Sequence, residues 1–510
     1  MNGSWMKGTV ILTITAFLIK ILSMVYKIPY QNIVGDEGLY VFQQVYPLIG
    51  IYTILSTVVI PTVISDLLLT YKYSDAIKQY IKRSFQLFSI FIFGVLFLGS
   101  NYIALLMGDI QLATSIRIIG LYFLLLPNIV YLRGVAQTRS NTIYHVGISN
   151  TIEQLVRVST IILVLVKFDH SNIYEIAYLS YLLGLLGPVL ALVYLSLIKS
   201  DDNPQIFVKL KQRPQLFKKL LFLFLCAGIL ILFQLIDSFF VFNSLVMSGA
   251  SALEAMQLKG IYDRGLPIIQ AATFFVGAIT LSTVPQMSKA KDEKERNNIF
   301  NSVLFFVILC SVPAAVGLFT VVESLNIALY TNSYGTLALQ ILSAQVLFYP
   351  FIYLITAVSQ QENRYTQLLV PILVGVFFKL IFTAPLTQSF GINGAALSSV
   401  IALGVMCIVN IFQFRKRIFK QSIYNFFKVM ISTGCMWVCI DFLTPAILGY
   451  ISLESERLFT VAVLLIQVLV GALSYGIFMM LFILTSKAPN SDVKRKKRKK
   501  RPSKGQKLKK

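Results

Sequence analysis

Residue types that often form catalytic or metal sites are scarce in this sequence. Its 510 residues include 2 histidines and 5 cysteines, and only 13% of them are charged. The cysteines all fall in apolar runs, and none stands with a histidine at the spacing of a metal site. We therefore expect no disulfide, no metal site and no cofactor.

Motifs of the common enzyme classes are missing as well. The sequence has no Gly-x-Ser-x-Gly elbow, no nucleotide-binding P-loop and no His-Glu-x-x-His helix. The segment 247–262, the longest loop expected on the outer side, has Glu254 and Lys259 as its only charged residues. A membrane glycosyltransferase, ligase or polymerase usually needs a larger loop with acids or arginines. We therefore expect that the protein is not an enzyme.

Apolar residues, in contrast, dominate the chain. They make up 56% of it, and the mean hydropathy is +0.74. A helix needs about 20 apolar residues to cross a bilayer, and windows of this length predict an all-α polytopic membrane protein with about fourteen spans. Their approximate bounds are 7–30, 39–69, 84–107, 112–137, 143–166, 175–198, 218–246, 263–288, 299–321, 334–359, 366–386, 392–412, 424–446 and 457–485.

The loops between these spans alternate between two kinds. Loops of one kind are strongly basic, and they are 71–84, 199–219, 288–298, 414–421 and the C-terminal segment after Ser486. Loops of the other kind, such as 34–38 and 453–457, carry few basic residues. Basic loops stay in the cytoplasm, so we expect both termini there. The C-terminal segment has the composition of a disordered tail that binds anionic inner-leaflet lipids, and we expect no nucleic acid partner.

The longest polar connection predicts how the spans are grouped. We expect an N-lobe of six helices over 1–198, a basic cytoplasmic linker over 199–217 and a C-lobe of six helices over 218–412. Two further helices over 413–486 and the disordered basic tail over 487–510 would follow.

Short internal matches support two related halves. The segment 56–61 resembles 282–285, and 134–137 resembles 356–360, in each case six spans further along the chain. Because six is even, both halves keep the same orientation, and they would face each other across a central cleft. This arrangement is typical of a transporter.

The first span carries two lysines, Lys20 and Lys27, about two helical turns apart. Both ammonium groups therefore lie on nearly the same face of a helix. Lysine inside a membrane helix normally faces the protein interior or a water-filled cavity. We predict that this helix is one wall of a cationic cavity. The alternatives are that Lys27 snorkels to the interface and that Lys20 pairs with an acid.

Two other predicted spans hold charged side chains whose roles are open to two interpretations. Arg264 offers a planar fork that suits phosphate or pyrophosphate; the alternative is an interfacial anchor neutralised by Asp263. Glu153 and Arg157 are four residues apart on one helix, and this spacing favours a structural ion pair.

The remaining charges within spans are Asp237, Lys379 and Arg117. Asp237 and Lys379 are candidates for a pair across the second half, and Arg117 is expected near the outer surface. Basic residues outnumber acids within the spans, so the predicted cargo is anionic.

Several short motifs follow one another along the chain. They are Lys7-Gly8-Thr9 before Lys20-Ile21-Leu22, Ile28-Pro29, Gly35-Asp36-Glu37-Gly38, Arg133-Gly134 with Gln137, Ile152-Glu153-Gln154 with Arg157-Val158, and Gly391-Ile392 with Gly394-Ala395-Ala396. In these motifs and their order the chain resembles, over about residues 5 to 485, the SpoVB-type polysaccharide transporters of Firmicutes. These transporters belong to the multidrug/oligosaccharidyl-lipid/polysaccharide (MOP) exporter superfamily, which includes the MurJ-type lipid II flippases.

The resemblance implies a two-lobed, MATE-like bundle in a bacterial plasma membrane, with a V-shaped cationic cavity lined by helices 1, 2, 7 and 8. Members of the family move undecaprenyl-pyrophosphate-linked saccharides, lipid II among them, from the inner to the outer leaflet by alternating access. Lys20, Lys27 and Arg264 match the family's cavity arginines and would bind the substrate. The supporting intramembrane charges would be Asp237, Asp263, Glu153, Arg157, Arg117 and Lys379.

The chain also departs from the family pattern. Lysine replaces arginine on helix 1, which keeps the charge but loses the bidentate fork, and residues 40–44 lack the acid that some members carry. Sodium-coupled members take ligands from helices 7 and 11; here Asp237 is present, but Lys379 stands where a carboxylate would be needed. Protons and the membrane potential are the other possible energy sources. The alternative function is a MATE-like multidrug cation antiporter, which would need acids facing the cavity.

Overall fold

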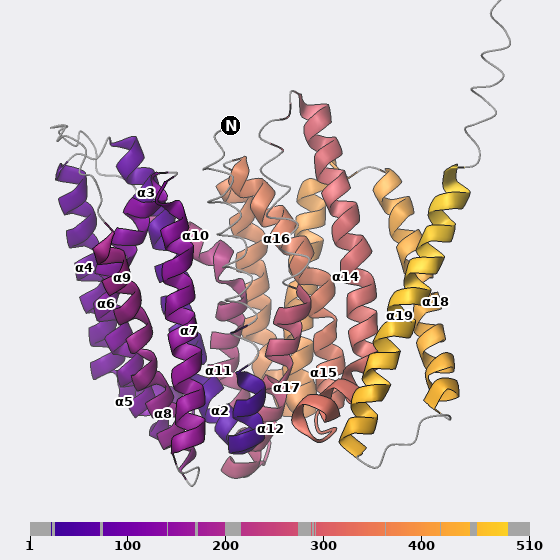
Figure 1. Cartoon of the computed structure of the whole chain (residues 1–510), viewed down its shortest axis with the longest axis horizontal. Coiled ribbons are helices and arrows are strands. Elements are labelled where there is room, and N and C mark those ends of the chain that lie inside the picture. The colour runs from indigo at the N-terminus through magenta and orange to yellow at the C-terminus, as the bar shows by residue number, and fades with distance from the viewer. Residues whose placement is uncertain are drawn as a thin grey trace, which may run out of the picture.

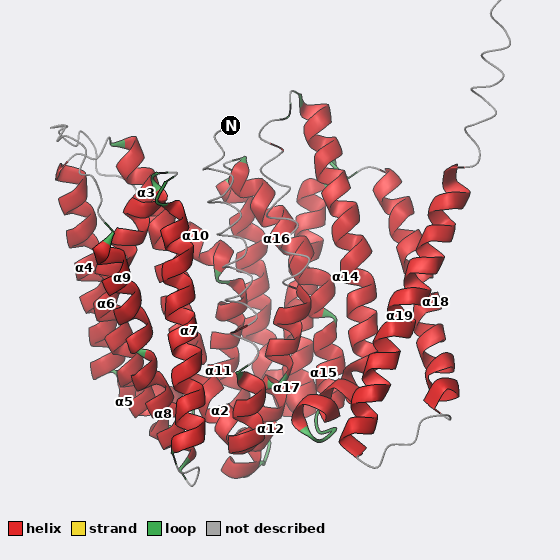
Figure 2. Cartoon of the chain, in the orientation of Figure 1, coloured by secondary structure: helices red, strands yellow, loops and turns green. Residues whose placement is uncertain are grey.

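The computed structural model of the chain describes most of its length. The described residues are 26–71, 75–139, 141–168, 172–198, 216–273, 292–362, 364–418, 420–448 and 456–487, with Leu22, Met287 and Ala290. Every regular element among them is a helix (Figure 2), and eleven helical stretches are long and apolar enough to cross a membrane. The predicted all-α, multi-pass membrane fold is confirmed. The count of fourteen spans stays a prediction, because much of the span at 7–30 and about half of the span at 263–288 lie outside the described residues.

The helices of the first half form the indigo-to-purple part of Figure 1. They are α2 (Lys27–Ile54), the π-helix η1 (Leu55–Val59), α3 (Ile60–Thr70), α4 (Asp75–Leu98), α5 (Ser100–Leu106), the 3-10 helix η2 (Ile110–Leu112), α6 (Ala113–Gln137), α7 (Ile143–Lys167), α8 (Ile173–Gly184) and α9 (Leu186–Leu197). The π-helical turn comes just before Pro61. A proline cannot donate the helical hydrogen bond of its position, and a π-turn absorbs such a break without ending the helix.

The second half continues to the yellow end of the colour bar. Its helices are α10 (Leu216–Ala227), α11 (Ile229–Met247), α12 (Ala252–Asp263), α14 (Glu293–Tyr330), α15 (Thr336–Ser343), α16 (Gln345–Gln361), α17 (Tyr365–Phe414), α18 (Lys420–Leu448) and α19 (Glu456–Lys487). Residues 265–273 are also helical and continue from α12 after a break at Arg264.

The element α2 contains a hairpin that turns at Gly35. This residue has φ 79°, a left-handed backbone that glycine adopts without the steric cost a Cβ would add. The chain then runs back on itself, since the rings of Tyr30 and Phe42 pack with their centroids 4.7 Å apart. The end of the first predicted span and the start of the second therefore meet here.

The element α17 is a second hairpin, which turns at Gly391 with φ 58°. Its arms are close: a Cβ on Gly394 would lie 1.8 Å from the carbonyl oxygen of Leu386, and Lys379 bonds to Ser398 across the turn at 3.0 Å. The predicted spans 366–386 and 392–412 are the two arms.

Two groups of helices pack side by side, and a pair lies at the edge (Figure 1). The N-terminal group is α2 to α9 and the C-terminal group is α10 to α17. They meet chiefly where α2 packs against α12 and α11. The helices α18 and α19 pack on each other and on α14. The predicted lobe boundaries stay a prediction, since the connection at 199–215 lies outside the described residues.

One loop prediction is wrong. The segment 247–262 was expected to be a loop, but Ala252–Asp263 forms the helix α12. Ser251 caps its start by accepting a hydrogen bond from the backbone N–H of Glu254 at 3.2 Å. Because α12 packs against α2 and does not need to cross a bilayer alone, it lacks the long apolar run by which spans are recognised.

Candidate functional site

The two groups of helices are joined by an ion pair between a buried arginine and a partly buried aspartate. Arg264, directly after α12, is 0% exposed. It donates from Nε to Oδ1 of Asp36 at 2.8 Å and from Nη2 to Oδ2 at 2.5 Å. Asp36 follows the turn at Gly35. This is the bidentate geometry that makes arginine–carboxylate pairs strong, and Asp36 and Arg264 are called the gate pair here.

The rest of the Arg264 guanidinium is also engaged. Nη1 donates to Oδ1 of Asn332 at 2.8 Å and to Oδ1 of Asn326 at 3.3 Å. The ring of Tyr330 lies 5.3 Å from its central carbon, a favourable contact between a cation and an aromatic face. The alternative of an interfacial anchor neutralised by Asp263 is therefore wrong, because Arg264 is fully buried and its carboxylate partner is Asp36.

Neighbouring contacts close the same end of the interface. Gln257 of α12 donates to Glu37 at 2.6 Å, and Asn32 donates to the carbonyl oxygen of Leu329 at 3.0 Å. At Gly260 the backbones approach so closely that a Cβ would lie 2.0 Å from the carbonyl oxygen of Asp36. Only glycine permits this approach of α12 to α2.

A different kind of contact joins the groups at the opposite end. From Asp36 the helical run continues to Asp66, which lies about 45 Å away at 1.5 Å per residue. Asp66 forms an ion pair with Lys219 of α10, and their side chains are 52% and 36% exposed. An exposed pair contributes little to stability. The groups are therefore held firmly at the end of the gate pair and weakly at the end of the basic loops.

The N-terminal group contains a carboxylate shared by two arginines. Glu153 accepts from Arg157 at 2.9 Å and from Arg133 at 2.8 Å. The predicted pair of Glu153 and Arg157 is confirmed, but Arg133 was not expected there. Arg133 also donates to Ser149 at 3.1 Å and to the carbonyl oxygen of Ser56 at 3.0 Å. One negative and two positive charges leave this buried cluster with an excess positive charge.

Lys27 is also buried. Its ammonium lies 4.2 Å from the ring centroid of Tyr46 in the same helical element, a favourable contact between a cation and an aromatic face. It does not snorkel to the membrane surface, because its side chain lies inside the protein. Lys20 lies outside the described residues.

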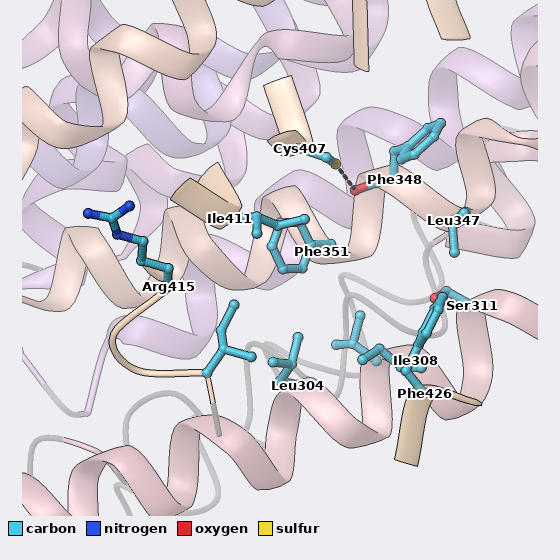
Figure 3. A pocket seen from close by; sticks show the side chains of 12 residues that line it. Leu304, Ile308, Ser311, Leu347, Phe348, Phe351, Cys407, Ile411, Arg415 and Phe426 are labelled. Carbon is cyan, nitrogen blue, oxygen red and sulfur yellow. Dashed lines mark hydrogen bonds between the residues drawn. The ribbon is translucent and has the colours of Figure 1, made fainter. Parts of the chain in front are cut away.

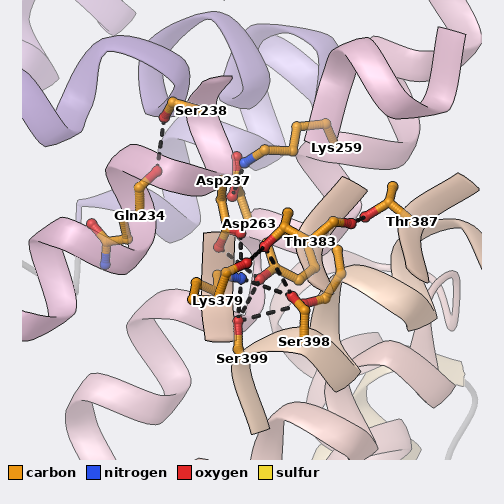
Figure 4. Close-up of polar contacts among 12 residues, drawn as sticks. Gln234, Asp237, Ser238, Lys259, Asp263, Lys379, Thr383, Thr387, Ser398 and Ser399 are labelled. Carbon is orange, nitrogen blue, oxygen red and sulfur yellow. Dashed lines mark hydrogen bonds and ion pairs between the residues drawn. The ribbon is translucent and has the colours of Figure 1, made fainter. Parts of the chain in front are cut away.

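The C-terminal group contains a network of balanced charges (Figure 4). Asp237 of α11 pairs with Lys379 of α17 at 2.5 Å, and Lys259 pairs with Asp263 at 2.6 Å. Tyr262 donates to Oδ2 of Asp237 at 2.9 Å and so connects α12 to this network. The predicted pairing of Asp237 with Lys379 is confirmed.

Arg117 is not brought to these charges. It donates from Nε to Oγ of Ser100 at 2.8 Å and from Nη2 to Oδ1 of Asn101 at 2.7 Å. Both acceptors belong to α5, so Arg117 fastens α5 to α6.

A cavity of about 420 Å³ lies between α14, α16, α17 and α18 (Figure 3). Its lining is apolar apart from Ser311 and Arg415, with Phe348, Phe351 and Phe426 among its largest side chains. Such a lining suits hydrocarbon and not a charged group. The cavity is therefore not a candidate for binding phosphate.

Three residues of the site were not singled out from the sequence. Asp36 and Arg133 have partners 228 and 20 positions away. No helical spacing connects such positions, although an acid at a predicted turn was a signal for Asp36. Lys259 and Asp263 are four residues apart, so the rule that identified Glu153 and Arg157 applies to them too.

Arg157 and Arg264 belong to separate cationic sites. Arg157 donates to Oγ1 of Thr53 at 3.4 Å, and Thr53 lies ~25 Å along the helical run from Asp36, the partner of Arg264. One anion therefore cannot contact both arginines. Arg264 donates to both carboxylate oxygens of Asp36, so its guanidinium has the geometry to bind an oxyanion in a bidentate way.

The chain is similar to known membrane proteins in both its sequence and its fold. Residues 5–291 match the model of a family described as polysaccharide biosynthesis protein. The chain is 33% identical to the uncharacterized membrane protein YabM of Bacillus subtilis over 81% of this chain and 80% of that one. It is 23% identical to the stage V sporulation protein B of the same organism, over 95% and 96%. Its fold is similar to that of the lipid II flippase MurJ in an inward closed conformation, with a TM-score of 0.70 at 16% identity over 93% of this chain and 98% of that one.

Proposed function

We propose that this chain, which belongs to the polysaccharide biosynthesis protein family, is a flippase and not an enzyme. Its substrate would be an undecaprenyl-pyrophosphate-linked saccharide, lipid II or another cell-wall or polysaccharide precursor. The protein moves this substrate from the inner to the outer leaflet by alternating access. The observation that carries the proposal is the buried fork of Arg264, which grips an oxyanion where the two groups of helices meet.

The substrate-binding residues in this proposal are Lys20, Lys27 and Arg264. Lys27 belongs to the N-terminal group and Arg264 to the C-terminal group, and each offers a positive charge to the pyrophosphate. The polyprenyl chain stays in lipid at a lateral opening, because burying its hydrocarbon in a charged site would gain nothing.

Alternating access follows from a competition for Arg264. When the gate pair is formed, the carboxylate of Asp36 holds α2 against α12. A pyrophosphate that binds Arg264 takes the place of this carboxylate and so releases the contact between the groups at that end. The energy of binding the substrate is then used to open the gate, as differential binding to two conformations requires.

The proposal places the protein in a bacterial plasma membrane with both termini in the cytoplasm. The basic loops and the basic tail lie on the cytoplasmic side, where the tail binds anionic lipids of the inner leaflet. The gate pair lies at the other end, so it closes the exit to the outside.

Reconstituted vesicles test this function directly. A fluorescent polyprenyl-pyrophosphate saccharide is placed in both leaflets, and a quencher added outside reports how fast the inner pool reaches the surface. Wild-type protein should accelerate this movement, and Lys20→Ala/Arg264→Ala should abolish the acceleration. Lys294→Ala, which removes an exposed lysine of α14, should leave it unchanged.

Two results would contradict the proposal. One is a double variant that retains the wild-type rate, which would show that the residues assigned to the substrate are wrong. Alternatively, wild-type protein leaves the lipid in place but transports cationic dyes in exchange for protons or sodium, which would establish the multidrug antiporter instead.

A further inference from the structure

Some members of the family are sodium-coupled and take ligands from helices 7 and 11, which correspond to α11 and the first arm of α17. The residues present here do not fit a sodium ion. Asp237 of α11 offers a carboxylate, but the ammonium of Lys379 lies 2.5 Å from its Oδ1. A metal ion at this carboxylate would stand directly beside a buried positive charge, and like charges repel strongly where water does not screen them.

The surroundings of Lys379 are those of a bound cation. Its side chain is 0% exposed. Its Nζ donates to Oγ of Ser399 at 2.6 Å and to Oγ of Ser398 at 3.0 Å, and it forms the ion pair with Asp237. Figure 4 shows these oxygens converging on the ammonium from α11 and from the second arm of α17. Protein sites that hold a dehydrated monovalent cation likewise replace its water shell with oxygen atoms.

We infer that Lys379 supplies the cation of this site itself: its tethered ammonium occupies the position among Asp237, Ser398 and Ser399 that a monovalent metal ion would otherwise take. The charge of Asp237 is already balanced. The site therefore holds α11 against both arms of α17 without sodium, and sodium does not drive this protein.

The same site is connected to the gate pair. The hydroxyl of Tyr262 donates to Oδ2 of Asp237 at 2.9 Å and lies 3.4 Å from Oγ of Ser399. Tyr262 precedes Arg264 by two residues at the end of α12. A permanent cation at Lys379 therefore fixes the end of α12 in the position from which Arg264 reaches Asp36, whatever the sodium concentration.

Removing the ammonium should turn the site into one that depends on a metal ion. In Lys379→Ala the carboxylate of Asp237 and the hydroxyls of Ser398 and Ser399 remain, and a vacated space with polar walls admits a cation with water. Purified full-length protein is unfolded by heat in sodium chloride and in choline chloride at equal ionic strength. Wild-type protein and Lys379→Arg should have the same Tm in both salts. Lys379→Ala should have a lower Tm in choline that rises saturably with sodium, by at least ~2 °C.

Two controls separate a specific site from general effects of salt. Asp237→Asn/Lys379→Ala lacks the carboxylate, so its Tm should not respond to sodium. Lys294→Ala removes an exposed lysine and should behave as wild type. If Lys379→Ala does not fold in either salt, Lys379→Gln, which fills more of the space, carries the same prediction.

Two results would overturn the inference. One is a saturable, sodium-specific rise of the wild-type Tm. The other is a folded Lys379→Ala or Lys379→Gln whose Tm is the same in sodium and choline. No lipid substrate enters these measurements, so their outcome is independent of the flippase proposal.

Discussion

The N-terminal and C-terminal groups of helices bury charge in different ways. In the C-terminal group, two acids each pair with a lysine of the same group, Asp237 with Lys379 and Asp263 with Lys259. In the N-terminal group, Glu153 pairs with two arginines, Arg133 and Arg157. A buried charge is costly unless it is compensated.

The difference predicts that the acids of the two groups contribute unequally to stability. The two lysine–aspartate pairs of the C-terminal group each join one acid to one base. Glu153, in contrast, compensates two buried arginines at once. We expect changes in the two groups to differ accordingly.

Removal of the shared carboxylate should have the largest effect. Glu153→Gln leaves Arg133 and Arg157 buried without a negative charge, which should cost ~3–5 kcal/mol of the free energy of unfolding. Asp263→Asn leaves a single lysine, so its cost should be smaller. Thermal unfolding of the purified variants, followed by circular dichroism, would rank them. The exposed Glu323 of α14 provides the control Glu323→Gln, and equal costs for Glu153→Gln and Asp263→Asn would contradict the comparison.

Loss of the gate pair should have the second-largest effect on stability. Asp36→Asn keeps the shape of the side chain but leaves Arg264 without its carboxylate, and losing one partner of a buried charged pair costs at least ~2 kcal/mol. If this loss opens the interface locally, hydrogen exchange of the α12 amides (252–263) should accelerate by roughly 30-fold, while that of α4 stays unchanged. Unchanged exchange in α12 would show that Asp36 does not hold the gate closed.

The close approach of the two backbones gives a third test. A Cβ on Gly260 would lie 2.0 Å from the carbonyl oxygen of Asp36, so Gly260→Ala must push α12 away from α2, at ~1–3 kcal/mol. The same hydrogen-exchange measurement should detect this opening. Gly434→Ala is the matched control, because nothing lies within 4 Å of its new Cβ; an equal response of both variants would exclude a specific effect on the gate.

The exposed pair at the other end should matter least. Lys219→Ala should change the free energy of unfolding by less than ~1 kcal/mol, and the change should shrink as salt is added. A cost comparable to that of Asp36→Asn would mean that both ends of the interface are held equally firmly.

The fold and two of the ion pairs could be predicted from the sequence alone. Apolar runs predicted the helical membrane fold, since each span must satisfy its own backbone hydrogen bonds in lipid. The spacing of Glu153 and Arg157 predicted their ion pair, because helix geometry fixes neighbours four residues apart. Asp237 and Lys379 were predicted to pair because they carry opposite charges within spans of the second half.

The partners of Arg264 and the nature of α12 could not be predicted in this way. Asp36 and Arg264 are 228 positions apart, and nothing in the spacing of one chain connects them; the neighbouring Asp263 was the wrong choice because it faces Lys259. The helix α12 packs on another helix and needs no long apolar run. Both depend on how the two groups of helices meet, which is a property of the folded chain.

The most direct test of the account is the affinity of the purified protein for a polyprenyl pyrophosphate saccharide, measured for wild type, Asp36→Asn and Arg264→Ala, with the polyprenyl monophosphate and a neutral lipid as controls. Both variants break the gate pair, so a purely structural role of the pair predicts the same change in both. Competition between Asp36 and the pyrophosphate for Arg264 predicts opposite changes: tighter binding by Asp36→Asn and weaker binding by Arg264→Ala, confined to the pyrophosphate. Changes in the same direction, or equal binding of all three lipids, would contradict the assignment of Arg264 to the substrate.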